Sequence, residues 1–411
     1  MKKAILIGPF TQILPLNKLP LRGALKDEQL EVINQGGIVV SGGKITAIGA
    51  YEELKKGNHE LEVIKGSQVC IPGLIDAHTH ICFGGTRAND YAMRNSGKSY
   101  LQIAKAGGGI WDTVTQTRMA SKKQLIDGII HRSNRHLKNG VTTLEVKSGY
   151  GLSVDQELKM LRAIKEANSQ VKQDLISTCL AAHMVPKDWN NSAEAYLLEI
   201  SESLFPTLKA EGLTQRIDAF IEDSAFSGLE IAPYFKAAKK QGFDITVHAD
   251  QFTPGGSEIA VHYKAISADH LEVSSQKEID LLAQSKTIAV ALPGASIGLG
   301  CDFTPVRKLL DAGAIVAIAS DHNPGSAPMG DLLTQACILG AFQKLSNAEV
   351  LAGITFRAAA ALKLKDRGIL EIGHKADFVS YPTNNYQEIT YQQGQLKPNG
   401  VWKNGTLVNP S

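Results

Sequence analysis

The chain has 411 residues, of which 43% are apolar and 20% are charged, and it carries a formal net charge of +2. The length predicts one large domain with a smaller one, and the near-neutral charge without a basic run argues against nucleic-acid binding. No segment approaches the roughly 20 apolar residues of a membrane span, and the five cysteines form no C-x-x-C pair, which predicts a reduced, cytoplasmic protein.

The N-terminal residues predict a β-strand. They begin with lysines and continue into an apolar run, as a secretory leader does, but glycine and proline interrupt the run and no small-residue cleavage site follows. Alternating apolar residues on both sides of the Gly42-Gly43 turn predict a hairpin, and the C-terminal residues show the same alternation. We therefore expect residues 1–68 and 366–411 to meet in one small β-domain.

Residues 69–365 have a different rhythm, in which short β-branched apolar runs alternate with helical patterns. The eight expected strands are 69–77, 141–146, 175–182, 218–222, 244–248, 265–269, 287–292 and 315–320. Helices are expected between them, for example at 156–167, 233–241 and 276–284. This alternation predicts an α/β fold with a parallel sheet, and eight repeats favour a (β/α)8 TIM-type barrel, although the count leaves a doubly wound sheet open.

Polar side chains stand at the carboxyl ends of these expected strands. They are His78, His80, His183, Glu222, His248, His270 and Asp321. In a barrel these strand ends meet at one mouth, where barrel enzymes carry their active sites. Residues two apart on a strand face the same way, so the rings of His78 and His80 both point inward. One histidine at a strand end is more often a hydrogen-bonded structural residue, but so many together favour a functional site.

Two imidazoles from one strand, a third from across the barrel and one carboxylate form a mixed nitrogen and oxygen ligand set. Such a set suits zinc, iron or manganese, and the sequence does not choose among them. A metal held in this way lowers the pKa of a bound water to about 7 and makes hydroxide available at neutral pH. The sequence therefore predicts a metal-dependent hydrolase.

The stretch 72–80, PGLIDAHTH, resembles the amidohydrolase superfamily. Further matching stretches follow in chain order: GGGI at 107–110, EVKSGYGL at 145–152, AHMVP at 182–186, HADQ at 248–251, SADHLE at 267–272, LPGA at 292–295 and SDHNPGS at 320–326. Together they resemble the imidazolonepropionase family within that superfamily. The KSGYGL and D-x-N-P-G stretches are specific to that family.

This resemblance implies a barrel with a small β-sandwich domain, a homodimer, and hydrolysis of the cyclic amide of 4-imidazolone-5-propanoate to N-formimidoyl-L-glutamate. It implies one divalent or trivalent metal ion per subunit, zinc or iron, with His78, His80, His248 and Asp321 as ligands. It implies a substrate site lined by Arg87, Tyr150, His183, Gln251, Asn323, Gly325 and Ser326. Some family members carry Glu at the position of Gln251, so a proton-relay role of that Glu is not carried over.

In the reaction that the resemblance implies, a metal-activated water attacks the ring carbonyl. Asp321 would take the proton of the water and pass it to the departing nitrogen. His183 would help to polarise the carbonyl, and His270 would orient the water or stabilise the oxyanion. We expect Arg87 to pair with the propionate and Glu222 to hold a ligand histidine in its tautomer. With Glu222 where two-metal relatives place a carboxylated lysine, a single metal is expected.

Two alternatives remain open. A deaminase of the same superfamily would use the same metal-activated water but would release ammonia from an amino-substituted ring. A non-catalytic relative would keep the barrel as a scaffold, but such proteins usually lose metal ligands, and this chain retains all four.

Overall fold

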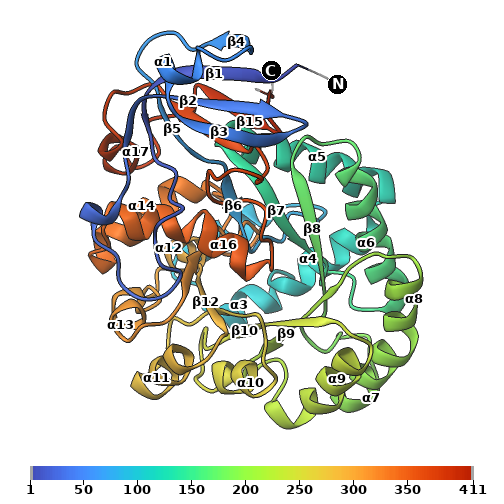
Figure 1. The fold of residues 1–411 in the computed structure, drawn as a ribbon. Coiled ribbons are helices and arrows are strands. Elements are labelled where there is room, and N and C mark those ends of the chain that lie inside the picture. The colour runs from blue at the N-terminus through green and yellow to red at the C-terminus, as the bar shows by residue number, and fades with distance from the viewer. Residues whose placement is uncertain (1–2, 409–411) are drawn as a thin grey trace.

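The computed structural model of the chain describes residues 3–408 and contains two eight-stranded sheets (Figure 1). In the larger unit the strands are β6 (Leu74–Asp76), β7 (Val141–Lys147), β8 (Asp174–Ala182), β9 (Arg216–Ile221), β10 (Asp244–Ala249), β11 (Ser267–His270), β12 (Ile288–Ala291) and β13 (Val316–Ile318). Each strand pairs in parallel with the next one in the chain. Just beyond the ends of β6 and β13, Thr79 and His322 form a parallel bridge that closes the sheet. The predicted (β/α)8 barrel is confirmed.

Helices connect the strands and cover the outside of the barrel (Figure 1). Those between strands are α2 (Ala88–Asn95), α3 (Tyr100–Lys105), α4 (Ile110–Met119), α5 (Lys122–Lys138), α6 (Val154–Asn168), α7 (Ala193–Glu199), the π-helix η2 (Ile200–Leu204), α8 (Phe205–Ala210), α9 (Gly228–Lys240), α10 (Gly256–His262), α11 (Gln276–Gln284), α12 (Pro293–Leu299) and α13 (Val306–Asp311). After the last strand come α14 (Leu332–Gln343), α15 (Asn347–Gly353) and α16 (Phe356–Ala361). Serine caps fix several helix starts: Ser227 and Ser275 accept hydrogen bonds from first-turn N–H groups of α9 and α11.

Both ends of the chain form the second sheet. Its strands are β1 (Ile5–Ile13), β2 (Ile33–Ser41), β3 (Lys44–Ala50), β4 (Glu60–Val63), β5 (Val69–Pro72), β14 (Phe378–Tyr381), β15 (Gly400–Lys403) and β16 (Thr406–Leu407), accompanied by η1 (Asp27–Gln29), α1 (Tyr51–Leu54) and α17 (Gln387–Tyr391). β5 pairs with β1 on one side and with β14 on the other, which joins the two ends. In the apolar core of this sheet Phe10, Phe378 and Trp402 pack ring against ring. The expected small β-domain is therefore present.

The strand that we predicted at residues 69–77 is divided at Gly73, so that part of the prediction is wrong. Val69–Pro72 (β5) belongs to the terminal sheet, and Leu74–Asp76 (β6) opens the barrel. Between them the N–H of Gly73 donates to the carbonyl of Asp377. A side chain at Gly73 would place its Cβ 2.4 Å from Oγ1 of the buried Thr142. The chain thus passes between the two sheets at a point where a larger residue would overlap the side chain of Thr142.

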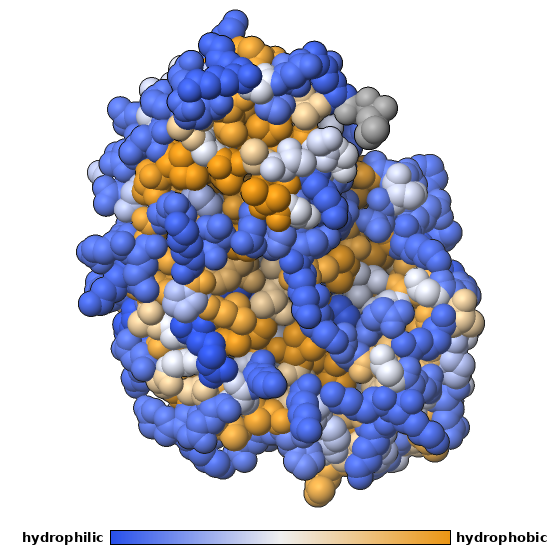
Figure 2. Space-filling model, in the orientation of Figure 1, coloured by the Kyte–Doolittle hydropathy of each residue, from blue (hydrophilic) through white to orange (hydrophobic). Residues whose placement is uncertain are grey.

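Surface polarity varies over the face seen in Figure 2. Apolar side chains gather over the terminal sheet and in the middle of the molecule, and polar side chains surround them. Among residues 3–408, no helix is both long and apolar enough to cross a membrane.

Candidate metal centre

Three histidine rings converge at the carboxyl-terminal mouth of the barrel. His78 and His80 follow β6, and His248 lies in β10. Nε2 of His80 is 3.2 Å from Nε2 of His78 and 3.3 Å from Nε2 of His248. All three rings are buried, and their nitrogens lie close enough together to hold one metal ion. The two-residue spacing of His78 and His80 therefore turns both rings inward, as the sequence predicted.

Asp321 completes this group from the end of the barrel's last strand. Its N–H donates to the carbonyl of His78, and its Oδ1 lies 3.6 Å from Nε2 of His78 and 3.5 Å from Nε2 of His80. Its Oδ2 accepts a hydrogen bond from Asn323 Nδ2 at 2.9 Å. The φ of Asp321 is 53°, a left-handed conformation that is uncommon outside glycine but that aspartate adopts more readily than most residues. The structure thus brings together the four residues that the resemblance implies as ligands.

An aspartate carboxylate lies beside Nδ1 of two of these rings. Oδ2 of Asp269 lies 2.7 Å from Nδ1 of His78, and Oδ2 of Asp218 lies 3.1 Å from Nδ1 of His248. A carboxylate at Nδ1 keeps the ring proton there, so Nε2 presents its lone pair to the cluster. Burial holds the pKa of His78 well below its usual value and lowers the pKa of His248 to about 4, although Asp218 opposes that shift. Both rings are therefore neutral at pH 7.

The donor set fits a metal ion. Burial also holds the pKa of His80 well below its usual value, so all three imidazoles are neutral at pH 7. Nε2 of His80 lies 3.2 Å from Nε2 of His78 and 3.3 Å from Nε2 of His248, so one cation between them can be bound by all three rings. Neutral imidazoles with a carboxylate beside them are the ligands that zinc and similar ions prefer.

Our expectation that Glu222 would hold a ligand histidine is wrong. Its carboxylate accepts hydrogen bonds from the backbone N–H groups of the loop that follows β10, at Gln251, Phe252 and Thr253 (2.8, 3.0 and 2.9 Å). Asp218 and Asp269 hold the ligand histidines instead, and the sequence analysis missed them. Each of these two aspartates lies inside an otherwise apolar, buried strand. An acid in such a place is rare without a partner, and this pattern could have identified them.

His270 ends β11 beside the cluster. Its ring centroid is 5.9 Å from that of His78 and 5.4 Å from that of His248. Burial alone would lower the pKa of His270, but Glu272, whose Oε1 lies 3.4 Å from Nδ1, outweighs it and raises the pKa. A protonated His270 can donate a hydrogen bond toward the mouth of the barrel.

His183 and Tyr150 form the next layer of the site. The ring of His183 stacks on that of His80 at 5.7 Å, and the ring of Tyr150 lies 5.6 Å from His183. Nδ1 of His183 donates to the carbonyl of Gly149 at 3.0 Å, and burial lowers the pKa of His183 to about 3. The neutral ring therefore offers Nε2 as an acceptor, which suits a substrate N–H better than the oxyanion that we expected it to stabilise. Burial raises the pKa of Tyr150, so its hydroxyl remains a donor.

Arg87 lies against the loop that follows Asp321. Its Nε donates to Oδ2 of Asp90 at 2.7 Å, and a Cβ on Gly325 would lie 2.5 Å from its Nη1. Oδ1 of Asn323 accepts hydrogen bonds from the N–H groups of Gly325 and Ser326, at 2.7 and 2.8 Å, which fixes this loop. The guanidinium therefore rests on a glycine, with its Nη groups next to a rigid turn.

Gln251 is placed less centrally. It is half-buried on the loop after His248, and its backbone N–H is held by Glu222. Within residues 3–408, no hydrogen bond joins its side chain to the histidines.

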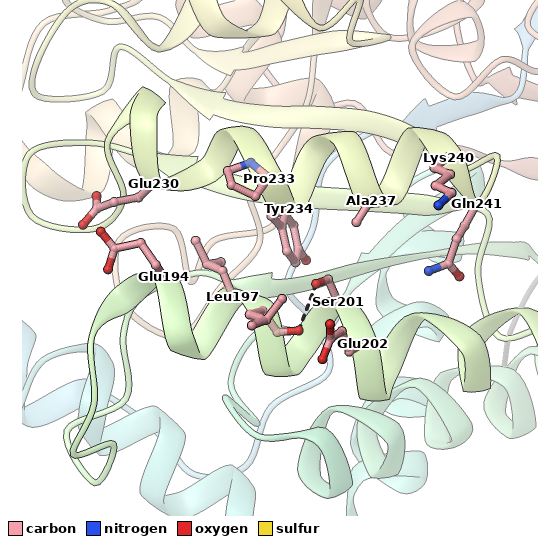
Figure 3. Close-up of a pocket in the computed structure, with 11 residues that line it drawn as sticks. Glu194, Leu197, Ser201, Glu202, Glu230, Pro233, Tyr234, Ala237, Lys240 and Gln241 are labelled. Carbon is pink, nitrogen blue, oxygen red and sulfur yellow. Dashed lines mark hydrogen bonds between the residues drawn. The ribbon is translucent and has the colours of Figure 1, made fainter.

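A groove of about 480 Å³ lies elsewhere, on the outside of the barrel between α7, η2 and α9 (Figure 3). Leu197 and Ser201 line one wall, and Pro233, Tyr234 and Ala237 line the other. None of the histidines described above belongs to its lining, so it is not part of the candidate metal centre.

The chain resembles known proteins in sequence and in fold. Residues 69–408 match the model of the amidohydrolase family. An imidazolonepropionase of Acinetobacter baumannii (strain AB307-0294) is 38% identical over 387 residues, which are 93% of this chain and 96% of that protein. An imidazolonepropionase of Bacillus cereus (strain AH187) is 39% identical over 383 residues, 92% of this chain and 90% of that protein. A crystal structure of an adenosine deaminase from Xanthomonas campestris with bound zinc has a TM-score of 0.72 at 17% identity, covering 98% of this chain and 92% of that chain, and shows the common fold.

Proposed function

The chain belongs to the amidohydrolase family and, within it, to the imidazolonepropionases, and from this premise we propose how it acts. It hydrolyses the cyclic amide of 4-imidazolone-5-propanoate and releases N-formimidoyl-L-glutamate. The observation that carries the proposal is the convergence of the Nε2 atoms of His78, His80 and His248 beside the carboxylate of Asp321. An amide needs an activated water, and this group is suited to hold the cation that activates it.

His78, His80, His248 and Asp321 would hold one divalent or trivalent ion per subunit, zinc or iron. When bound, the ion polarises the ring carbonyl and lowers the pKa of water to about 7. The engagement of Glu222 with the loop 251–253 supports a single ion, because the acid at the end of the fourth barrel strand is then unavailable to a second one.

Asp321 and His270 would manage the protons of the reaction. Burial raises the pKa of Asp321 to about 6 in the metal-free site, and a bound cation would lower it, so a proton that Asp321 takes up is readily passed on. Asp321 accepts a proton from the attacking water and donates it to the departing ring nitrogen. His270, whose pKa Glu272 raises, would donate a hydrogen bond to the oxygen on which negative charge develops.

Arg87 would bind the propionate arm of the substrate. Since Asp90 occupies Nε, both Nη groups remain for a two-pronged contact with a carboxylate. The missing side chain at Gly325 leaves room for the guanidinium itself, and Asn323 and Ser326 line the same turn. With its propionate carboxylate bound to Arg87 at the rim of the site, the substrate would turn its ring toward the histidines.

The remaining residues would orient the ring. His183 accepts a hydrogen bond from a ring N–H, and the Tyr150 hydroxyl donates one to a ring acceptor. Gln251 stays a proposed substrate contact because it follows His248 on the loop at the mouth. From the family resemblance and the composition we also propose a cytoplasmic homodimer that acts on this small molecule and binds neither nucleic acid nor membranes.

The test follows the ultraviolet absorption of imidazolonepropionate with purified protein, with chelator-treated protein, and with treated protein resupplied with zinc, iron or manganese. We expect consumption by the first sample, none by the second, and recovery with at least one metal. Turnover by protein shown to be free of metal would contradict the proposal. So would release of ammonia from cytosine or guanine without any consumption of imidazolonepropionate, since that result identifies a deaminase.

A further inference from the structure

A buried lysine lies next to the histidine cluster, and the reaction described above does not use it. Lys147 ends β7, within the stretch KSGYGL, and its side chain is 0% exposed. Its Nζ lies 2.8 Å from Oε1 of Glu145. It also lies 2.7 Å from Oδ2 of Asp218 and 3.9 Å from Oδ2 of Asp269. Burying an ammonium among three acids costs desolvation free energy for every charged group involved.

Two of these acids are the ones that hold the ligand histidines. The same Oδ2 of Asp218 that contacts Lys147 also contacts Nδ1 of His248. The same Oδ2 of Asp269 that faces Lys147 also contacts Nδ1 of His78. One ammonium is therefore connected to two of the metal-binding rings, each through a single shared oxygen.

Lys147 is charged in this position. Burial would lower the pKa of its ammonium, but Asp218, Glu145 and Asp269 outweigh burial and raise the pKa. Glu145 anchors the ammonium from the other side and also accepts a hydrogen bond from Thr178 at 2.5 Å. Glu145 thus binds the ammonium in addition to the two aspartates.

We propose that Lys147 is a positioning residue of the metal site. Its ammonium holds Asp218 and Asp269 where they keep the Nδ1 protons of His248 and His78, and so keeps both Nε2 lone pairs aimed at the metal. The inference rests on the proposed metal site, and Lys147 itself contacts neither metal nor substrate.

The alternative is that Lys147 only sets the electrostatic potential at the metal site. This alternative predicts the opposite effect of Lys147 on the affinity for the metal. Removal of a buried cation favours the binding of another cation nearby, so a purely electrostatic Lys147 would weaken metal binding in the wild type. A positioning Lys147 strengthens it, because its loss frees the aspartates to rotate away from the rings.

The experiment measures the zinc affinity of metal-free protein by competition with a chromophoric chelator, without reference to activity. Lys147→Met keeps the length of the side chain and removes the charge. We expect the dissociation constant for zinc to rise by about 10- to 100-fold, the usual cost of losing a residue that orients metal ligands. An unchanged or tighter dissociation constant would overturn the proposal.

The matched control is Lys403→Met. Lys403 is also buried, with Nζ 2.5 Å from Oδ2 of Asp377 and 2.9 Å from Oδ2 of Asp174, but it lies in β15 of the terminal sheet. Both variants lose a buried ion pair and should unfold at a lower temperature. Only the Lys147 variant should bind zinc more weakly, and an equal loss of affinity in both variants would reduce Lys147 to a general structural role and overturn the proposal.

If Lys147→Met alone does not fold, Glu145→Gln/Lys147→Met carries the test, because it leaves neither member of that pair as an unpaired buried charge. This variant also lacks the ammonium and should also bind zinc more weakly. Long-range nitrogen-15 spectra of the metal-free protein provide a second readout: His78 and His248 should carry the proton on Nδ1 in the wild type and mixed tautomers in the variant, whereas unchanged tautomers would overturn the proposal. A wild-type protein that binds none of zinc, iron and manganese would overturn the proposed function itself, so the two failures are distinguishable.

Discussion

Each histidine of the metal centre depends differently on its neighbours. Asp269 lies within hydrogen-bond distance of Nδ1 of His78, and Asp218 lies 3.1 Å from Nδ1 of His248 without a hydrogen-bond geometry, whereas no acid lies beside the buried Nδ1 of His80 among the described residues. His80 is therefore kept in place by ring contacts with His183 and Tyr150 rather than by a carboxylate. Sequence reasoning found the rings but not their supports, because which acid meets which ring depends on register between strands that are far apart in the chain.

Asp321→Asn tests the proton transfer. The amide can neither accept nor return a proton, so kcat at saturating zinc should fall by about 10²- to 10⁴-fold. The thermal unfolding temperature should stay near that of the wild type, because Asn323 can still hydrogen-bond to the side chain. Asp280→Asn, an exposed acid of α11, is the control and should keep full activity. Near-normal kcat in the Asp321 variant would rule out its role.

Arg87→Ala tests the carboxylate contact. Loss of a charged two-pronged pair should raise KM by about 10- to 100-fold and leave kcat less affected. Arg87→Lys keeps the charge but not the planar fork, so its KM should lie between those of the wild type and the alanine variant. Steady-state kinetics measure both constants, and an unchanged KM in the alanine variant would place the propionate elsewhere.

At the scale of elements, periodicity predicted the barrel well but missed details that depend on single residues. The helix expected at 276–284 is α11 (Gln276–Gln284), and the strand expected at 244–248 is β10 (Asp244–Ala249). The helix expected at 233–241 begins earlier, at Gly228, because the cap at Ser227 starts it and Pro233 is accommodated inside. The division of the first expected strand at Gly73 escaped notice because both of its halves are apolar and buried, so their composition does not tell one sheet from the other.

Gly73→Ala tests that division. The new Cβ would overlap Thr142, so the variant should lose about 1–3 kcal/mol of stability through overpacking. Gly49→Ala is the control, since a Cβ there meets nothing within 4 Å, and Gly73→Ala/Thr142→Ala should recover much of the loss. Denaturant unfolding compares the three. Equal stability of the Gly73 and Gly49 variants would contradict the account.

At the scale of the whole molecule, one acid joins the two units. Asp174, at the start of β8, forms ion pairs with Arg367, Lys375 and Lys403 of the C-terminal segment. Its Oδ2 lies 2.9 Å from Nζ of each lysine. Burial would raise the pKa of Asp174, but the lysines and Arg367 hold it well below its usual range. The resulting stabilisation is present above the ordinary carboxyl pKa of about 4 and is lost as pH falls toward the lower folded value.

Asp174→Asn should therefore lower stability at pH 7 by roughly 1–3 kcal/mol, discounted because the carboxylate is one-third exposed. The difference from the wild type should shrink below pH 4. Asp366→Asn removes a more exposed acid from Arg367 and Lys375 and should cost less. Thermal unfolding at several pH values measures these effects, and a pH-independent difference would argue against the ion pairs.

Removal of metal should also act on the whole molecule. An ion that binds only the folded state stabilises it by about 2.7 kcal/mol when free metal is 100 times Kd. Zinc-loaded protein should therefore unfold at a higher temperature than chelator-treated protein in calorimetry. Identical transitions would show that the barrel does not bind the ion in its native form.

The bridge between Thr79 and His322 is the seam of the barrel, with His78 and His80 on one side of it and Asp321 on the other. A chain still being synthesised has His78 and His80 long before it has Asp321, and it cannot gather them until the last strand has docked. An ion bound by residues on both sides of that seam would stabilise the closed barrel. The enzyme would become active only after the last strand has folded into place. A chain that ends before Asp321 would lack this ligand, so the water-activating centre could not assemble in it.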